Sequence, residues 1–169
     1  IWRDLARLSS DTGMEPERVR RTRSAIVANV STYLNFKGNT FEAFEFYKSV
    51  FGTDYVGPVV RMGDVQGEGM PPAGDDTKDL IMNIQLPTLG SHLLMGTDTV
   101  GEWGDGLVVG NNISIMLHAD SREQADTLFA NLSAGGQVEM PMQDQFWGDY
   151  YGSFKDKFGV PWMIIHSGR

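Results

Sequence analysis

Three histidines are the side chains of this sequence best suited to metal or proton chemistry. His92 and His118 fall at the ends of predicted strands, where imidazole nitrogens can bind a divalent metal or transfer protons. Two histidines without a carboxylate partner form an incomplete set of metal ligands, so hydrogen-bonded structural histidines are the better interpretation. His166 shares a strand face with Trp162 and Ile164 and is expected to point away from any cavity.

A second candidate is the segment QDQFWGDYYG, which places aromatic rings beside carboxylates. Such a combination favours a flat or cationic ligand. Trp147 and Tyr150 are therefore predicted to contact a ligand, although Trp147 is equally typical of a core or dimer contact. Asp144, Asp149 and Tyr150 are candidate acids and bases, but nothing in the sequence marks any of them as catalytic, so the catalytic residues are unknown.

The sequence offers little support for nucleophilic catalysis. The chain has no cysteine, which excludes thiol nucleophiles, disulfides and thiolate metal sites. No Ser–His–acid triad can be argued from the spacing of these residues.

The elements that must position these side chains occur twice, in stretches that follow one plan. The first reads STYLNFKGNTFEAFEFYKSVFG and the second NISIMLHADSREQADTLFANLSAGG. Each begins with strand-like alternation and continues into a helix. Asn39 with Glu42, and Asp120 with Glu123, fit helix N-caps followed three residues later by glutamate, and the two pairs lie 81 residues apart. The repeat predicts a duplicated fold with a cavity shared between its halves.

Three strands are predicted after each helix: Tyr55–Met62, Leu80–Leu86 and Ser91–Thr97, then Val138–Gln145, Tyr150–Lys155 and Trp162–His166. This order predicts an α+β fold of two βαβββ modules with antiparallel sheets, module one at about 28–100 and module two at about 110–167. The polar stretch 63–79 is predicted to be a surface loop, either a lid or a simple excursion. Residues 1–27 have no counterpart and are predicted to be an N-terminal extension, either helical or foreign to the native chain.

Charge and hydropathy exclude several classes of function. Residues 1–27 carry a net charge of +2 and the remainder −10, and so acidic a body argues against a nucleic-acid groove. It would attract a cationic ligand, although solubility is the simpler explanation. No apolar run approaches the roughly 20 residues of a membrane-spanning helix, and no signal-peptide pattern opens the chain. A cytoplasmic location is expected.

Two longer motifs carry a family resemblance. YLNFKGNTFEAFEFYKSVFG and MPMQDQFWGDYYGSFKDKFGVPWMIIHS closely resemble the PhnB-like branch of the vicinal oxygen chelate superfamily, over about residues 28–167. That superfamily includes glyoxalase I, extradiol dioxygenases and bleomycin-resistance proteins. The resemblance implies sheets curled around a cavity and a homodimer. Members of this branch are often labelled demethylubiquinone methyltransferase-like, but no Gly-rich turn suited to a nucleotide-like cofactor is present, so methyl transfer is not predicted.

The resemblance also allows a test for metal binding. In the metal enzymes of the superfamily, four inward strand positions hold a divalent cation, and these map here to Ser31, Leu94, Asn112 and Met163. None of these is a good ligand for a hard cation. No cofactor is therefore predicted, with a divalent metal at His92 and His118 as the alternative.

Strand alternation describes the predicted pocket. Thr32, Leu34 and Phe36 are expected to pack on the helix, which leaves Tyr33 and Asn35 facing the cavity. The predicted ligand pocket consists of Ser31, Tyr33, Asn35, Leu94, Asn112, Ser114, Met116, Trp147, Tyr150 and Met163. An apolar hollow with a few hydrogen-bonding groups is typical of small-molecule sites.

The sequence thus predicts a metal-independent protein that binds a small, aromatic or cationic molecule. One alternative is a lyase, isomerase or dioxygenase of the same superfamily with a displaced metal at His92 and His118. The other is a dimeric structural or interaction module.

Overall fold

The computed structural model describes residues 29–65 and 73–168. The predicted extension 1–27 and the central part of the loop 63–79 lie outside the described residues. The elements in chain order are β1 (Ser31–Phe36), α1 (Thr40–Phe51), β2 (Val60–Arg61), a 3-10 turn (Met62–Asp64), β3 (Ile81–Pro87), β4 (Leu93–Asp98), α2 (Gly101–Asp105), β5 (Ile115–His118), α3 (Arg122–Leu132), β6 (Gln137–Asp144), β7 (Asp149–Lys155) and β8 (Pro161–Ser167).

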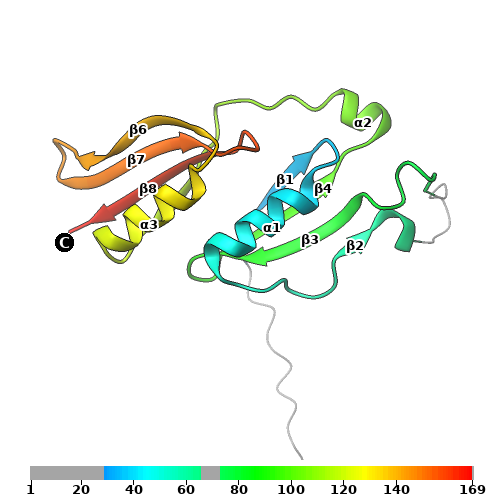
Figure 1. The fold of residues 1–169 in the computed structure, drawn as a ribbon, viewed down its shortest axis with the longest axis horizontal. Helices are drawn as coiled ribbons and strands as arrows, with labels where there is room; N and C mark the ends of the chain where they lie inside the picture. The colour runs from blue at the N-terminus through cyan, green and yellow to red at the C-terminus, as the bar shows by residue number, and fades with distance from the viewer. Residues whose placement is uncertain (1–28, 66–72, 169) are drawn as a thin grey trace, which may run out of the picture.

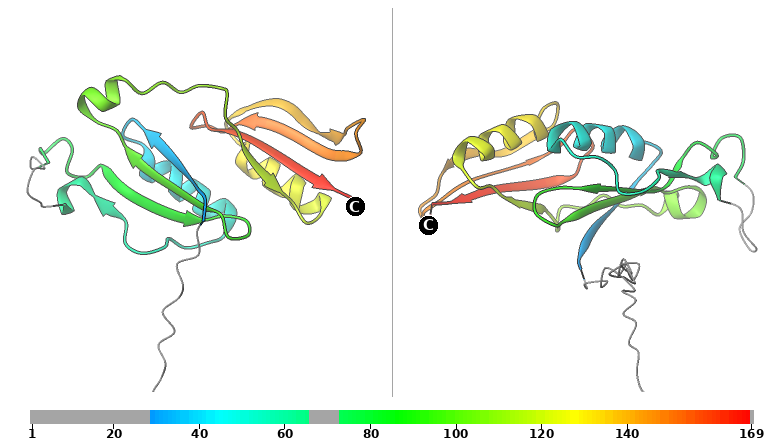
Figure 2. Two further views of the ribbon diagram at one scale, coloured as in Figure 1. Left: turned by 180° about the vertical axis from the view of Figure 1, so that it is seen from behind. Right: turned by 90° about the horizontal axis from the view of Figure 1, so that it is seen from below.

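The described elements form two modules that repeat one architecture, and the predicted α+β class is confirmed (Figure 1). Each module has a four-stranded sheet, ordered β1-β4-β3-β2 in one and β5-β8-β7-β6 in the other. The sheets are mixed rather than antiparallel, because β1 runs parallel to β4 and β5 runs parallel to β8. Helices α1 and α3 cover the same side of the two sheets, which are not closed into a barrel (Figure 2).

Two predicted strands are shorter than expected. The stretch Tyr55–Met62 contains only the strand β2, because Gly57 adopts a positive φ of 74° and Pro58 follows it. In module two, β5 begins at Ile115 rather than at the start of the predicted stretch NISIMLH. The exposed residues before it belong to the connector between the modules, which also contains α2.

The helix starts differ from the predicted caps. Asn39 occupies the N-cap of α1 but makes no capping bond with its side chain. Instead, Asp98 Oδ1 at the end of β4 accepts from the backbone amides of Gly38 and Thr40, each at 3.0 Å. A buried carboxylate from another element therefore satisfies the donors that a local cap would otherwise take.

In α3 the cap lies one residue later than predicted. Ser121 accepts from the amide of Gln124 at 3.1 Å, and Gln124 Oε1 accepts from the amide of Asp120 at 2.7 Å. Ser121 and Gln124 thus form a variant of the Ser-x-x-Gln capping box, in which the glutamine accepts from the residue before the cap.

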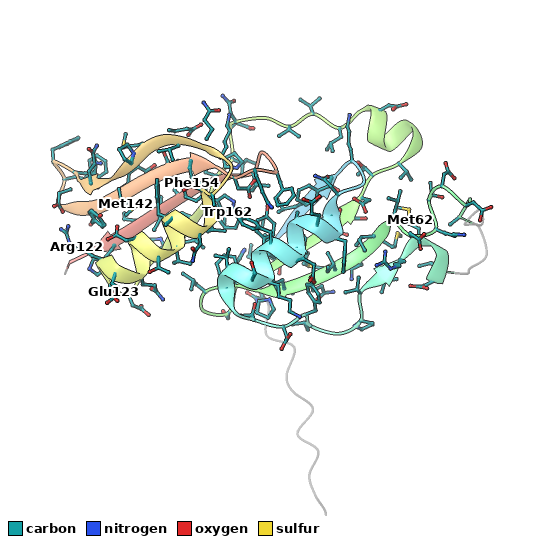
Figure 3. The ribbon with its side chains drawn as sticks, viewed as in Figure 1. Met62, Arg122, Glu123, Met142, Phe154 and Trp162 are labelled. Atoms are coloured by element: carbon teal, nitrogen blue, oxygen red, sulfur yellow. The ribbon has the colours of Figure 1, made fainter. Side chains whose placement is uncertain are left out.

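The core lies between the helices and the sheets and continues across the junction of the modules. Phe44 of α1 packs directly on β4, where a Cβ on Gly96 would lie 2.5 Å from the Phe44 ring. Tyr47, from the same helix, stacks edge-on against Trp162 of module two with ring centroids 5.7 Å apart. Trp162 lies at the meeting point of the two modules (Figure 3). Helix α1 therefore serves both cores and fixes one module against the other.

Candidate functional site

A hollow of about 640 Å³ lies at the junction of the modules. Three segments form its walls: β1 with the turn that follows it, the connector residues 107–113, and the β7–β8 turn at 158–161. Sites of roughly 300–1,000 Å³ are typical for small molecules. We call this hollow the junction cavity.

The turn after β1 is held from behind by Asp98, which is 3% exposed. Besides the two amides at the start of α1, its carboxylate accepts from Thr40 Oγ1 at 2.6 Å and from the amide of Ile81 at 2.8 Å. Gly38 in this turn has a φ of 92°, a conformation that side chains disfavour. The cavity wall from Asn35 to Asn39 is thus fixed by buried hydrogen bonds.

The β7–β8 turn is held in the same way by Asp156, which is also 3% exposed. Its carboxylate accepts from the amides of Phe158 and Val160, each at 2.9 Å, and from Trp162 Nε1 at 2.9 Å. The fourth donor is the hydroxyl of Tyr47 at 2.7 Å, which comes from module one. Burial, together with the Asp156 carboxylate, raises the pKa of Tyr47 well above its usual value, so this hydroxyl stays a donor.

The lining of the junction cavity is apolar with a few polar groups. The connector and the β7–β8 turn supply Leu107, Val109, Ile113 and Val160, and β1 with its exit turn supplies Tyr33, Asn35, Lys37 and Asn39. Asn112 adds a further amide. This mixture of apolar surface and convergent hydrogen-bonding groups suits an organic ligand.

A second hollow of about 410 Å³ lies beside the β3–β4 turn and β5. Both His92 and His118 line it, so the structure brings these two residues to one place. His92 Nε2 is 3.0 Å from Thr32 Oγ1, and this contact occupies one of its ring nitrogens. His166 bonds through Nδ1 to the backbone carbonyl of Ala119 at 2.9 Å and lines neither hollow.

The predicted pocket residues divide among several places. Tyr33, Asn35 and Asn112 line the junction cavity, and Ser114 and Met116 line the second hollow. The remaining five residues line neither of these hollows: Ser31, Leu94, Trp147, Tyr150 and Met163.

The inward orientation predicted for Leu94 is wrong, because this side chain is fully buried in the core. In the sheet it is paired with Thr32 of β1 and Leu86 of β3, on the helix side of module one. Tyr150 also packs toward its helix: its hydroxyl donates to Asp126 of α3 at 2.7 Å, and Arg122 lies 4.4 Å from its ring centroid. The hydrogen bond to Asp126 raises the pKa of Tyr150.

Apart from Asn112, sequence reasoning missed the connector residues of the cavity, and it also missed Lys37. The connector residues 107–113 have no strand or helix period, and they reach the cavity only because the chain crosses between the modules there. Lys37 lies between Asn35 and Asn39 in the segment NFKGN. This polar segment at the end of a predicted strand was the feature of the sequence that could have pointed to Lys37.

The metal site of the superfamily does not fit these residues. Among residues 29–65 and 73–168, no three His, Asp or Glu side chains are grouped so as to hold a metal ion. Asp144 forms an ion pair with Arg122, which holds the pKa of that carboxyl below its usual range. The described side chains therefore offer His92 and His118 without a third ligand.

Comparison with known proteins identifies a family and several relatives of this chain. A family model described as 3-demethylubiquinone-9 3-methyltransferase matches residues 28–165. Protein YjdN of Escherichia coli K12 is 29% identical over 140 residues, covering 80% of this chain and 92% of YjdN. The crystal structure of PA1353 from Pseudomonas aeruginosa is 34% identical, with a TM-score of 0.69, and the match covers 83% of this chain and 98% of PA1353.

The same fold occurs in a glyoxalase/bleomycin resistance/dioxygenase family enzyme from Burkholderia phytofirmans PsJN. That structure is 16% identical, with a TM-score of 0.53, over 80% of this chain and 96% of the enzyme. A fold of this kind hosts several chemistries, so the likeness defines an architecture and no activity. The chain belongs to the family whose model is described as 3-demethylubiquinone-9 3-methyltransferase, and it shares its fold with the glyoxalase/bleomycin resistance/dioxygenase structure.

Proposed function

We propose that this protein binds a small organic molecule in the junction cavity and that binding requires no metal. The observation that carries the proposal is the cavity itself, with about 640 Å³ of space and a mainly apolar lining on a fixed frame. Buried Asp98 and Asp156 hold two of its three walls. A preformed apolar hollow with a few hydrogen-bonding groups is the usual form of a ligand site.

An enzyme with a displaced metal is less well supported. It needs His92 and His118 as ligands, but one nitrogen of His92 contacts Thr32 and no carboxylate lines the second hollow. The candidate acid–base groups lie elsewhere, because Asp144 is paired with Arg122 and Tyr150 with Asp126. Neither Asp144 nor Tyr150 lines the junction cavity.

A cavity-blocking variant tests the site. Val109 is 69% exposed in the connector and reaches to 4.0 Å from a Cβ placed on Gly159 across the cavity. Val109→Trp is therefore expected to weaken ligand binding by at least about tenfold, because the indole fills the ligand's space. Val56→Trp is the matched control, since Val56 is 50% exposed and does not line the cavity.

Binding would be measured by isothermal titration against a panel of small aromatic and aliphatic acids, amides and amines. The titration is repeated after treatment with a chelator, together with elemental analysis of the protein. Equal affinity before and after chelation is expected. A stoichiometric metal whose removal abolishes binding would contradict the metal-independent part of the proposal.

A homodimer remains a prediction, and the exposed aromatic tip of the β6–β7 hairpin supports it. Phe146 is 97% exposed and stacks on Trp147 with ring centroids 4.9 Å apart. Exposed aromatic pairs of this kind are common at interfaces. Light scattering at micromolar concentration is expected to give the mass of two chains, and Phe146→Ser is expected to shift that mass toward the monomer. A monomeric mass for the unaltered protein would contradict this prediction.

A further inference from the structure

We infer that the ligand of the junction cavity is a small organic anion, held at its charged end by Lys37. This inference rests on the proposed function, because it names the chemical class of the molecule bound at that site. It departs from the cationic ligand that the acidic composition suggests.

The first observation is the charge of the cavity wall. Of the 22 Asp and Glu residues of the chain, 18 lie in residues 28–169. None of those that the structure describes lines the junction cavity, and Lys37 alone among the described lining residues carries a charge. A cation would find no carboxylate there to replace its hydration shell, whereas an anion would find one ammonium group.

The second observation is that the Lys37 ammonium makes no ion pair with any residue the structure describes. The other described basic side chains are engaged: Lys48 with Asp54, Lys78 with Asp75, Arg122 with Asp144, Lys155 with Glu139, Arg61 with the Asp79 carbonyl and Lys157 over the Phe46 ring. Within the described structure, Lys37 differs from these residues because its ammonium makes no ion pair, side-chain hydrogen bond or contact with an aromatic ring, which leaves it available to a ligand.

The third observation concerns Asp98, the carboxylate that bonds the turn carrying Lys37. Asp98 bonds the amides of Gly38 and Thr40 on either side of Asn39, so it faces the interior of the turn. Its four hydrogen bonds satisfy both oxygens, and the residue does not line the cavity. Asp98 therefore fixes the backbone that carries Lys37, and its own carboxylate is not available as a partner for Lys37.

The remaining lining narrows the class of anion. Asn35, Asn39 and Asn112 supply amide donors for an acidic group. The opposite walls are apolar, with Leu107, Val109 and Ile113 from the connector. One cation and an apolar wall suit a monoanion with an aromatic or aliphatic body. They do not suit a polyphosphate, which requires several cationic groups.

The carboxylates that suggested a cationic ligand lie elsewhere. Asp144 ends β6 and pairs with Arg122, and Asp149 begins β7. Neither lines the junction cavity.

The test uses the full chain and three pairs of probes, each a carboxylate with its neutral amide: benzoate and benzamide, phenylacetate and phenylacetamide, octanoate and octanamide. Isothermal titration at low salt is expected to give at least about fivefold tighter binding of the carboxylate in each pair that binds. Lys37→Gln is expected to remove this preference, because it weakens the binding of the carboxylate more than that of the amide in each pair. Lys78→Gln makes the same change of net charge outside the cavity and is expected to keep the preference.

The outcomes separate the inference from the proposed function. Equal binding of acids and amides by the unaltered protein, or a preference that survives Lys37→Gln, overturns the anion inference and leaves ligand binding in place. Loss of the preference in both lysine variants also overturns it, because net charge rather than Lys37 is then responsible. If no acid, amide or amine binds at all, the proposed function fails and the inference fails with it.

Discussion

Replacing Asp156 with alanine is expected to lower the free energy of unfolding by about 3–5 kcal/mol. The carboxylate is buried and accepts four hydrogen bonds, so its loss leaves four buried donors without their acceptor. Two of these donors, Tyr47 Oη and Trp162 Nε1, come from different modules. The change therefore weakens the attachment of module one to module two as well as the turn between β7 and β8.

Urea denaturation followed by circular dichroism measures this effect. Asp120→Ala is the matched control, because Asp120 is exposed and contributes only its backbone amide to the α3 cap. The control is expected to change stability by less than about 0.5 kcal/mol. A loss below about 1 kcal/mol for Asp156→Ala would show that Asp156 does not hold the modules together.

Replacing Asp98 with alanine is expected to have the second largest effect, a loss of about 2–4 kcal/mol in the free energy of unfolding. Its four bonds close the β1–α1 turn and tie it to β3. Ligand affinity is expected to fall by about tenfold as well, because the cavity wall from Asn35 to Asn39 loses its fixed geometry.

Asp98→Ala is followed in the same denaturation experiment and by titration with the probes that the unaltered protein binds. Asp105→Ala is the control, since Asp105 is exposed and does not line the cavity. A destabilised variant that binds with unchanged affinity would separate the stability of the turn from the site and contradict the role given to the turn.

Much of the fold was predictable because its apolar pattern repeats. The alternation in STYLNF and the helix that follows correspond to β1 and α1, and the same order appears as β5 and α3. The helix boundaries were less accurate. A cap supplied by Asp98, 59 positions beyond Asn39, leaves no local signal in the sequence.

The orientation of β4 could not be settled from its pattern. Leu93, Leu94 and Met95 are apolar on both faces of the strand, so alternation does not distinguish the helix side from the open side. The parallel register with β1 determines which face of β4 points to the helix, because it sets Leu94 opposite Thr32. That pairing joins segments about sixty residues apart and is a property of the fold as a whole.

The candidate site was predicted only in part for the same reason. Tyr33 and Asn35 were predicted from the alternation of β1, and Asn112 from the second repeat, although it lies in the connector before β5; all three line the junction cavity. The connector wall and the β7–β8 turn carry no periodic signal, and contacts between the modules, such as those of Tyr47 with Trp162 and Asp156, bring them together around the cavity. Trp147 and Tyr150 were predicted as ligand contacts because their segment is rich in aromatic and acidic residues. They lie in module two, outside the junction cavity.

The most direct test of the central claim, that the junction cavity is the ligand site, is to map binding residue by residue. Amide shifts of the ¹⁵N-labelled protein would be followed while phenylacetate and then phenylacetamide are added. The account predicts changes confined to 33–39, 107–113 and 158–161, the three walls of the cavity. Changes centred on the β6–β7 hairpin around Trp147 or on the second hollow around His118, or none with either probe, would contradict it.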